Sequence, residues 1–370
     1  MSHTGRVSVR LAFLLGIAHF AVSQLMNAAE PKLTRFYPPA VGAGQSWTVT
    51  AEGTFAEWPV EVHVFPPDLQ VKCLEKKGQV ELTAGTECPS GRYWVRFSND
   101  EGWSDPQPII VSSSEVQLET SGTELSNGDR VQPDAPQKLP AMFAGKLEKS
   151  GDVDTYIVPV KANQTLTVSV TSNEIFSSPA DCVLQVVSSK GFVLAQNDDE
   201  RNLDPLVRWT SPTDGEVAVR LFCFPVAPNS TIAFAGGGAY IYLLEATQGA
   251  YLDYTLPLAS NAESRAATAI GWHLPDTNVV LRPITSPLGE VTFAGDRSAG
   301  WFQPERTDRQ TTVLDETEDG PILELPIDAS GHLEQDGDVD RCQFEARKGA
   351  TYSIEVQCRR FRLATAATLK

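Results

Sequence analysis

Residues 139–154 read LPAMFAGKLEKSGDVD and residues 325–340 read LPIDASGHLEQDGDVD, so one pattern occurs twice, 186 residues apart. The register continues without a gap through TYIVPVKANQTLTVSV (155–170) and RCQFEARKGATYSIEV (341–356). Gly145 and the GDVD stretch of residues 151–154 are identical in both copies. Two segments of this length do not match in one register by chance, so the sequence predicts a repeated structural module.

A second, weaker repeat joins two other segments. Residues 39–55 (PAVGAGQSWTVTAEGTF) match residues 257–273 (PLASNAESRAATAIGWH) at a spacing of 218 residues, with Pro39/Pro257 and Gly53/Gly271 as the clearest pairs. Two interleaved repeats predict an alternating order of modules, A–B–A′–B′. We place these modules at residues 30–112, 114–248, 249–312 and 313–370, after a leader at residues 1–29.

Within the modules the hydrophobic period is that of β-strands. Side-chain character alternates in residues 47–51 (WTVTA), 60–64 (VEVHV), 93–97 (YWVRF) and 166–170 (LTVSV), and turn residues such as Asp214-Gly215 separate similar runs. Alternation in segments rich in β-branched and aromatic residues predicts half-buried strands. No long helical pattern follows residue 29. We therefore expect an all-β chain of tandem β-sandwich modules, Ig-like and jelly-roll-like.

Charge excludes one class of partner. The formal net charge is −17, and the leader carries two arginines and no acid, so the rest of the chain is more acidic still. Such a surface repels phosphate backbones, and we expect no nucleic-acid partner.

The N-terminus has the layout of a secretory signal peptide. Arg6 and Arg10 precede an apolar run at residues 11–26, and Ala28-Ala29 precede the charged Glu30. The alternative is a membrane anchor, but a membrane span needs about 20 mostly apolar residues, and this run is shorter and contains polar residues. We therefore expect cleavage after Ala29, a secreted or cell-envelope protein, and no membrane span in the mature chain.

Six cysteines fall into three local pairs, each inside one predicted module. Exported proteins meet an oxidising environment, so disulfides are the expected state. Zinc binding is disfavoured because there is no CxxC motif and no His at ligand spacing. Buried free thiols are the alternative for some of the six. The expected disulfides are Cys73–Cys88, Cys182–Cys223 and Cys342–Cys358.

The segment that begins at Leu139 resembles a known family. The residues that carry the resemblance are Gly145, GDVDTY (151–156), Asp181, Gly191, NDD (197–199) and Asp214-Gly215. As a set they resemble the bacterial pre-peptidase C-terminal (PPC) domain, a β-sandwich jelly roll found in secreted proteases and other exported proteins. The resemblance covers residues 139 to about 246, and in the second copy it reaches only Arg359, so we expect that copy to be truncated. Residues 30–112 resemble an Ig-like IPT/TIG domain, with GRYWVRFSNDEG (91–102) as its late strand and turn.

The resemblance also implies a calcium site. In collagenase relatives of the PPC domain, an acidic linker joins aspartates of the GDxD type around Ca²⁺. The corresponding residues here are Asp152, Asp154, Glu124, Asn127 and Asp129. Ca²⁺ takes six to eight oxygen ligands, so donors from both segments are needed. The alternative is that GDVD is a turn before a strand, whose carboxylates accept backbone N–H groups.

No catalytic motif is present. The chain contains no GxSxG, no HExxH and no P-loop. Only His63, His273 and His332 follow the leader, and none has a Ser or Cys partner in a recognisable context. We therefore expect a protein that is not an enzyme.

These observations predict a non-catalytic exported protein whose modules mediate binding, adhesion, or matrix or surface contact. Its expected partners are an extracellular protein, a matrix component or a cell-surface component. The alternative is the accessory N-terminal part of a secreted hydrolase, a peptidase, whose catalytic domain lies outside this chain. Of the tryptophans, we expect Trp47, Trp94, Trp209 and Trp272 to pack in cores, and Trp58, Trp103 and Trp301, which lie nearer turns, to be the better candidates for a ligand face.

Overall fold

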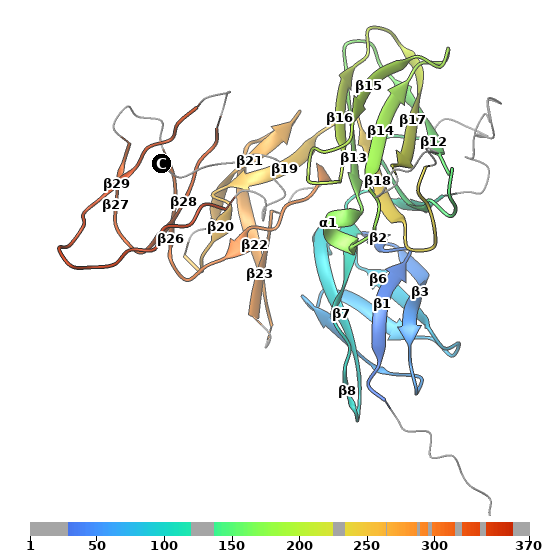
Figure 1. Ribbon diagram of the computed structural model, residues 1–370, viewed down its shortest axis with the longest axis horizontal. Coiled ribbons are helices and arrows are strands. Elements are labelled where there is room, and N and C mark those ends of the chain that lie inside the picture. The colour runs from blue at the N-terminus through green and yellow to red at the C-terminus, as the bar shows by residue number, and fades with distance from the viewer. Residues whose placement is uncertain are drawn as a thin grey trace, which may run out of the picture.

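The protein is built almost entirely of β-strands (Figure 1). A computed structural model describes residues 29–119, 137–224, 234–263, 265–286, 289–294, 298–314, 320–333 and 338–357. Within these ranges the single helix is α1 (Asn173–Phe176), and no helix is long and apolar enough to cross a membrane. The all-β prediction is confirmed. The predicted leader at residues 1–29 lies, except for Ala29, outside the described residues.

The first Ig-like sandwich is formed by residues 32–112. Its strands are β1 (Lys32–Tyr37), β2 (Ala40–Gly42), β3 (Ser46–Thr54), β4 (Glu61–Phe65), β5 (Leu69–Cys73), β6 (Gln79–Ala84), β7 (Gly91–Asn99), β8 (Gly102–Trp103) and β9 (Gln107–Ser112). One sheet has the order β1-β3-β6-β5 and the other β2-β9-β7-β4, with β8 beside β7. Alternation decides which side of β7 is buried: Tyr93, Val95 and Phe97 are 0% exposed and point into the core.

The second sandwich is formed by residues 116–247. Its strands are β10 (Val116–Leu118), β11 (Ala141–Lys146), β12 (Asp154–Val160), β13 (Thr165–Thr171), β14 (Cys182–Val187), β15 (Val193–Asn197), β16 (Leu206–Thr210), β17 (Gly215–Cys223) and β18 (Ile241–Thr247). They form sheets of order β10-β11-β18-β13-β16 and β12-β17-β14-β15. Helix α1 joins this sandwich to the first, because its Ile175 and Phe176 belong to one apolar cluster with Ile110 of β9.

A third group of strands forms a single five-stranded sheet of order β23-β22-β21-β19-β24 and a small β20-β25 pair. Its strands are β19 (Tyr251–Leu256), β20 (Ala259–Ser260), β21 (Ala266–Trp272), β22 (Asn278–Ser286), β23 (Gly289–Ala294), β24 (Ala299–Gly300) and β25 (Glu305–Arg306).

The weaker sequence repeat corresponds to a repeated strand pair, with one correction of register. Leu33 pairs with Gly53 between β1 and β3, and Leu252 pairs with Gly271 between β19 and β21. A Cβ atom at either glycine would lie 2.0 Å from a carbonyl oxygen of the partner strand, so only glycine fits. The two glycines are 218 residues apart, but Leu33 and Leu252 are 219 apart. The predicted match of Pro39 with Pro257 is therefore one residue out of register.

The hairpin formed by β22 and β23 lies against the first sandwich, an arrangement that the sequence did not predict (Figure 1). Phe293 of β23 is 0% exposed and belongs to the core cluster of the first sandwich, with its ring centroid 5.6 Å from that of Tyr93. Arg282 of β22 donates a hydrogen bond to the Glu87 carbonyl (3.0 Å). Sequence-distant segments therefore share one core.

The second copy of the 139–170 pattern repeats only part of the fold. Strands β26 (Gln310–Val313) and β28 (Ile327–Ser330) pair in parallel, as β10 and β11 do, and β27 (Ile322–Leu323) pairs with β29 (Gln343–Phe344). Beyond β29 no strand is described, and Ile354 is 60% exposed whereas its counterpart Val168 is 0% exposed. In the first copy β16 and β18 flank β13, and no described strand takes their places beside residues 350–357. The described part of the second copy therefore repeats the parallel β10–β11 pairing as β26–β28, and the expected truncation of this copy stays a prediction.

Candidate functional site

The outer face of the β2-β9-β7-β4 sheet presents a group of aromatic and charged side chains. Because Tyr93, Val95 and Phe97 point into the core, the alternate residues of β7 point outward. The antiparallel register places His63 of β4 opposite Arg96, and Phe65 opposite Trp94. Two strands that are distant in the sequence thus combine their polar positions on one surface.

Trp103 joins this face from β8. The turn before it is held by Asn99, whose Oδ1 accepts hydrogen bonds from the backbone N–H groups of Glu101 (3.0 Å) and Gly102 (3.2 Å). This turn sets Trp103 opposite Ser98 in the β7–β8 pair. Trp103 remains 51% exposed, so a large aromatic side chain is held at the surface by a well-defined turn.

Two neighbours fix the orientation of the Trp103 indole. The ring centroids of His63 and Trp103 are 4.2 Å apart. The Arg96 guanidinium carbon lies 5.3 Å from the indole centroid, a cation–π distance, and Arg96 Nε donates to the Ser104 carbonyl (2.8 Å). Because the indole is already held in one orientation, stacking of a ligand on it costs little side-chain conformational entropy of Trp103.

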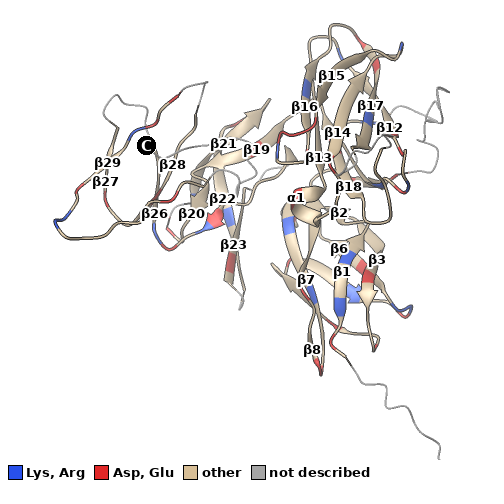
Figure 2. Ribbon diagram, viewed as in Figure 1, with Lys and Arg blue, Asp and Glu red and all other residues tan. Residues whose placement is uncertain are grey.

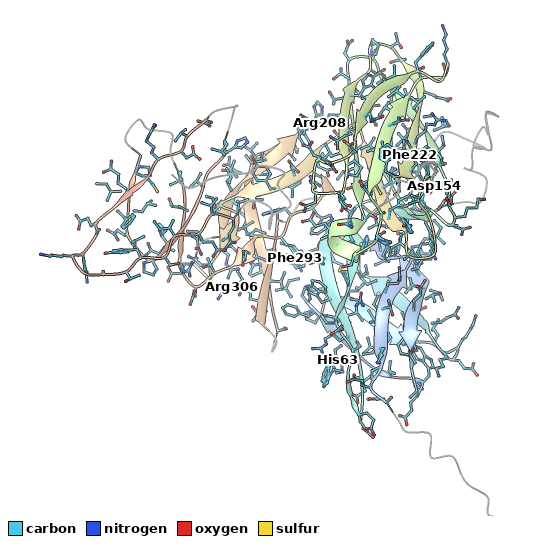
Figure 3. All side chains as sticks on the ribbon, viewed as in Figure 1. His63, Asp154, Arg208, Phe222, Phe293 and Arg306 are labelled. Atoms are coloured by element: carbon cyan, nitrogen blue, oxygen red, sulfur yellow. The ribbon has the colours of Figure 1, made fainter. Side chains whose placement is uncertain are left out.

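Polar groups surround the indole. Ser98 Oγ lies 2.8 Å from His63 Nε2 and donates to Glu61 Oε2 (3.2 Å). The Glu61 side chain is 78% exposed, so most of its carboxylate is open to a ligand. We call Trp103, His63, Arg96, Ser98 and Glu61 the Trp103 platform; Figure 3 labels His63, at the end of the first sandwich remote from the second.

The His63–Ser98 contact does not have the geometry of a catalytic triad. In a triad the carboxylate orients the imidazole through the nitrogen that does not face the serine. Here Glu61 accepts from Ser98 itself, and its approach to His63 is to Nε2, at 3.8 Å. The pair also lies on an open sheet face, next to an exposed indole. The sequence did not predict this contact, which joins β4 to β7.

The tryptophans divide differently from the prediction. Trp58, expected near a surface, packs against the core of the first sandwich and donates from Nε1 to the Leu74 carbonyl (2.7 Å). Trp301 packs against the cluster between the two sandwiches. Trp94, expected in a core, is on the outer face with the Arg92 guanidinium 4.8 Å from its ring. Of the three turn-side candidates, only Trp103 is exposed.

The structure describes two of the five residues of the predicted calcium site, Asp152 and Asp154. Glu124, Asn127 and Asp129 lie outside the described residues, and no group of three or more His, Cys, Asp or Glu side chains in the described ranges could hold a metal ion. Asp152 Oδ2 accepts a hydrogen bond from the Glu148 backbone N–H (2.6 Å), as the turn interpretation predicts. Calcium binding stays a prediction.

Asp154 has an unusual environment for a carboxylate. It is 0% exposed, and its Oδ2 accepts a hydrogen bond from the Tyr242 hydroxyl (2.5 Å), whereas its Oδ1 is buried without a hydrogen-bond partner. Burial, reinforced by the neighbouring Glu119 carboxylate, raises the pKa of Asp154 to about 10. Without a cation, this shift favours the neutral, protonated form of Asp154. Figure 3 labels Asp154 in the second sandwich, far from His63.

The cysteine pairs have different outcomes. Cys182 and Cys223 are directly opposite each other on β14 and β17, both 0% exposed, with their Sγ atoms 3.4 Å apart as free thiols. Cys342 is exposed, and Cys358 lies outside the described residues.

The predicted Cys73–Cys88 disulfide is wrong. Cys73 is at one end of β5, whereas the Cys88 thiol contacts the Asp68 carbonyl (3.6 Å) just before the other end. The five residues of β5 span about 13 Å, and a disulfide needs Cα atoms within about 7 Å. Both thiols are free, and Cys88 lies 3.3 Å from the Tyr93 hydroxyl.

We expect the Cys182 and Cys223 thiols to oxidise to a disulfide in a protein purified from an oxidising compartment. The mass of the intact chain would fall by two hydrogen atoms for this bond, and the corresponding cross-linked peptide would be found by non-reducing peptide mapping. Reduction would then lower the free energy of unfolding of the second sandwich by roughly 2 kcal/mol or more. A Cys182–Cys223 peptide pair that alkylates fully without reductant contradicts this prediction.

Comparison with known proteins gives matches among solved structures, at low identity and low TM-scores. No protein-family profile and no curated protein sequence matches the chain. Among solved structures, a Bacteroides ovatus glucan-utilisation protein, SGBP-B, solved with a mixed-linkage heptasaccharide, covers 60% of this chain and 77% of its own, at 11% identity and a TM-score of 0.20. A chimeric titin Z1Z2 matches at 14% identity, 76% and 99% coverage and a TM-score of 0.17. Immunoglobulin domains 1–4 of Sidekick-1 match at 14% identity, 76% coverage of each chain and a TM-score of 0.17.

Proposed function

We propose that this chain is a non-catalytic, exported binding protein that contacts an extracellular protein, matrix or cell-surface component through the Trp103 platform. The observation that carries the proposal is the 51% exposed Trp103 indole, fixed by His63 and Arg96 on the outer face of a rigid sheet. Exposed aromatic and Arg side chains that are already ordered are typical centres of recognition surfaces.

Export and module type belong to the same proposal. The signal-peptide layout of residues 1–29 supports secretion, and the GDVD stretch, repeated at the same spacing within the chain, supports a PPC-type second sandwich. The His63–Ser98 contact supports a non-catalytic reading, because it has no carboxylate orienting the far side of the imidazole. Turnover of an ester or glycoside substrate that is lost in a Ser98→Ala variant would overturn this part.

Substitution of Trp103 by Ala tests the binding role. The purified chain is applied to arrays of immobilised matrix proteins, cell-surface extracts and polysaccharides, and bound protein is measured. We expect Trp103→Ala to weaken the strongest interaction by about tenfold or more, because loss of a central aromatic contact commonly costs over 1 kcal/mol. Phe192→Ala is the matched control, since Phe192 is 69% exposed on the second sandwich. Equal binding by wild type and both variants would contradict the proposal.

A further inference from the structure

We infer that the Trp103 platform binds a neutral polysaccharide; this inference rests on the proposed binding function and names its ligand class. A pyranose ring has two parts that need different partners. Its C–H groups pack on a flat aromatic face, and its hydroxyl groups form hydrogen bonds at the ring's edge. The Trp103 platform offers both parts within one small area.

The small apolar area of the platform favours a sugar over a protein. Trp103 is the one exposed large hydrophobic residue among residues 29–112, all of which the structure describes. Stable protein interfaces bury about 800 Å² on each partner around a largely apolar centre. A single indole surrounded by charged and polar groups does not supply such a centre. It does supply one stacking surface, which is what a sugar ring needs.

The groups around the indole match hydroxyl chemistry. Glu61 provides a carboxylate acceptor on a side chain that is 78% exposed, and the His63 imidazole, on a side chain that is 34% exposed, lies beside it. Ser98 is buried and orders both groups through its hydroxyl. Arg96 provides guanidinium donors beyond the Nε that bonds to Ser104. Acceptors and donors therefore lie beside the stacking surface, where the hydroxyls of a stacked sugar would lie.

Local charge selects a neutral chain. Exposed acids cluster around the platform: Glu61 on β4, Asp100 and Glu101 in the β7–β8 turn, and Asp105 after β8. Figure 2 shows acidic residues at the β8 end of the first sandwich and basic residues along β7. Arg96 and Arg92 together do not offset four carboxylates, and the whole chain is acidic at −17. Uronate-rich or sulfated polysaccharides would therefore be repelled.

A second aromatic residue extends the surface in the direction of the strand. Trp94 lies on the same face as Arg96, two residues away along β7, with its ring held by Arg92. Trp103 pairs with Ser98, four residues from Trp94 along β7. Four strand residues span about 13 Å, a distance over which one oligosaccharide of several sugar units can contact both tryptophans. The ligand is therefore a chain of sugars and not a monosaccharide.

The test is affinity electrophoresis of the full chain in native gels. The gels contain a neutral polymer (hydroxyethyl cellulose, soluble xylan or galactomannan), an anionic polymer (alginate or polygalacturonate) or none. We expect wild type to be retarded by at least one neutral polymer and by neither anionic polymer. Trp103→Ala should lower the apparent affinity at least tenfold, Trp103→Phe should keep part of it, and Phe192→Ala should match wild type.

Three outcomes would overturn the inference. They are no retardation by any neutral polymer, retardation that Trp103→Ala leaves unchanged, and stronger retardation by the anionic polymers. If Trp103-dependent binding appears only on protein arrays, the ligand class is wrong and the proposed function stands. If no surface on either assay depends on Trp103, both fail. Circular dichroism and thermal unfolding of each variant establish that it folds.

Discussion

Asp154→Asn is expected to stabilise the protein in calcium-free buffer at pH 8, by about 3 kcal/mol or more. Asp154 is completely buried, and its pKa is raised to about 10 by burial and by Glu119. An ordinary aspartate in the unfolded chain ionises near pH 4. At pH 8 the native state must therefore keep a proton that the unfolded chain releases, and this opposes folding. The amide of the Asp154→Asn variant does not titrate, so folding no longer requires a proton to be kept at this position. Its oxygen can still accept a hydrogen bond from the Tyr242 hydroxyl.

The pH dependence follows from the direction of the shift. Because the folded pKa lies above the unfolded one, the native state binds more protons between about pH 4 and pH 10, and stability falls as pH rises through that window. The gain from Asp154→Asn should therefore be near zero at pH 4 and grow toward pH 8. Urea unfolding at several pH values measures it. Asp152→Asn is the control, because Asp152 serves as a backbone acceptor for Glu148. A gain independent of pH would contradict this prediction.

Added calcium separates the two interpretations of the GDVD stretch. We expect millimolar Ca²⁺ to raise the melting temperature of wild type and a chelator to reverse the rise, because a ligand that binds only the native state stabilises it by mass action. Asp154→Asn should abolish this response, since Ca²⁺ requires the ionised carboxylate. If Ca²⁺ does not change the melting temperature of wild type, the calcium interpretation is wrong, and the GDVD stretch is a turn that precedes a strand with a buried acid.

Sequence reasoning succeeded where the structure is local. The alternation of residues 93–97 predicts a half-buried strand, and the structure buries Tyr93, Val95 and Phe97 on one side of β7, because the side-chain period of a strand is two. The pair Gly53/Gly271 predicts a repeated segment, and the structure gives the reason for both glycines: a Cβ atom at either position would lie 2.0 Å from a carbonyl oxygen of the partner strand. A repeated Gly at a fixed place in a hairpin reports backbone geometry directly.

It failed where pairing between distant segments decides the outcome. The alternating pattern around Trp94 does not tell whether its side chain lies on the buried or the exposed side of the strand. Only the pairing of β7 with β4 and β9 shows that it faces outward. Phe293 fills the first core because the β22–β23 hairpin reaches it. Cys73 and Cys88 are close in sequence, yet a whole strand separates them. The sequence therefore allows only part of the site to be predicted. Polar residues at every second position of residues 60–64 (VEVHV) and 92–97 (RYWVRF) indicate that each strand has an outward face, but they do not show that His63 lies opposite Arg96.

The junction between the second sandwich and the third sheet depends on a buried arginine. Arg201 is 8% exposed and donates to the Tyr251 hydroxyl (3.2 Å) and to the Asp253 carboxylate. Next to it Glu245 accepts a hydrogen bond from the Gly300 backbone N–H (2.9 Å). Burial raises the pKa of Glu245 to about 7, and the charge of Arg201 opposes that rise. The Arg201 guanidinium thus stabilises the carboxylates of Asp253 and Glu245, which join the second sandwich to the third sheet.

Arg201→Met is therefore expected to lower the free energy of unfolding by about 3–5 kcal/mol, because removing one partner of a buried ion pair leaves the other charge uncompensated. Urea unfolding measures this loss, and limited proteolysis should show earlier cleavage around residues 248–250. Arg309→Met is the matched control: its pair with Asp328 is 56% and 30% exposed, and such pairs contribute about 1 kcal/mol or less. Adding Asp253→Asn to Arg201→Met should restore part of the stability, because it removes the carboxylate left without a partner. A loss no larger than that of Arg309→Met would mean that apolar packing alone, through Leu206, Tyr251 and Ala299, fixes the junction.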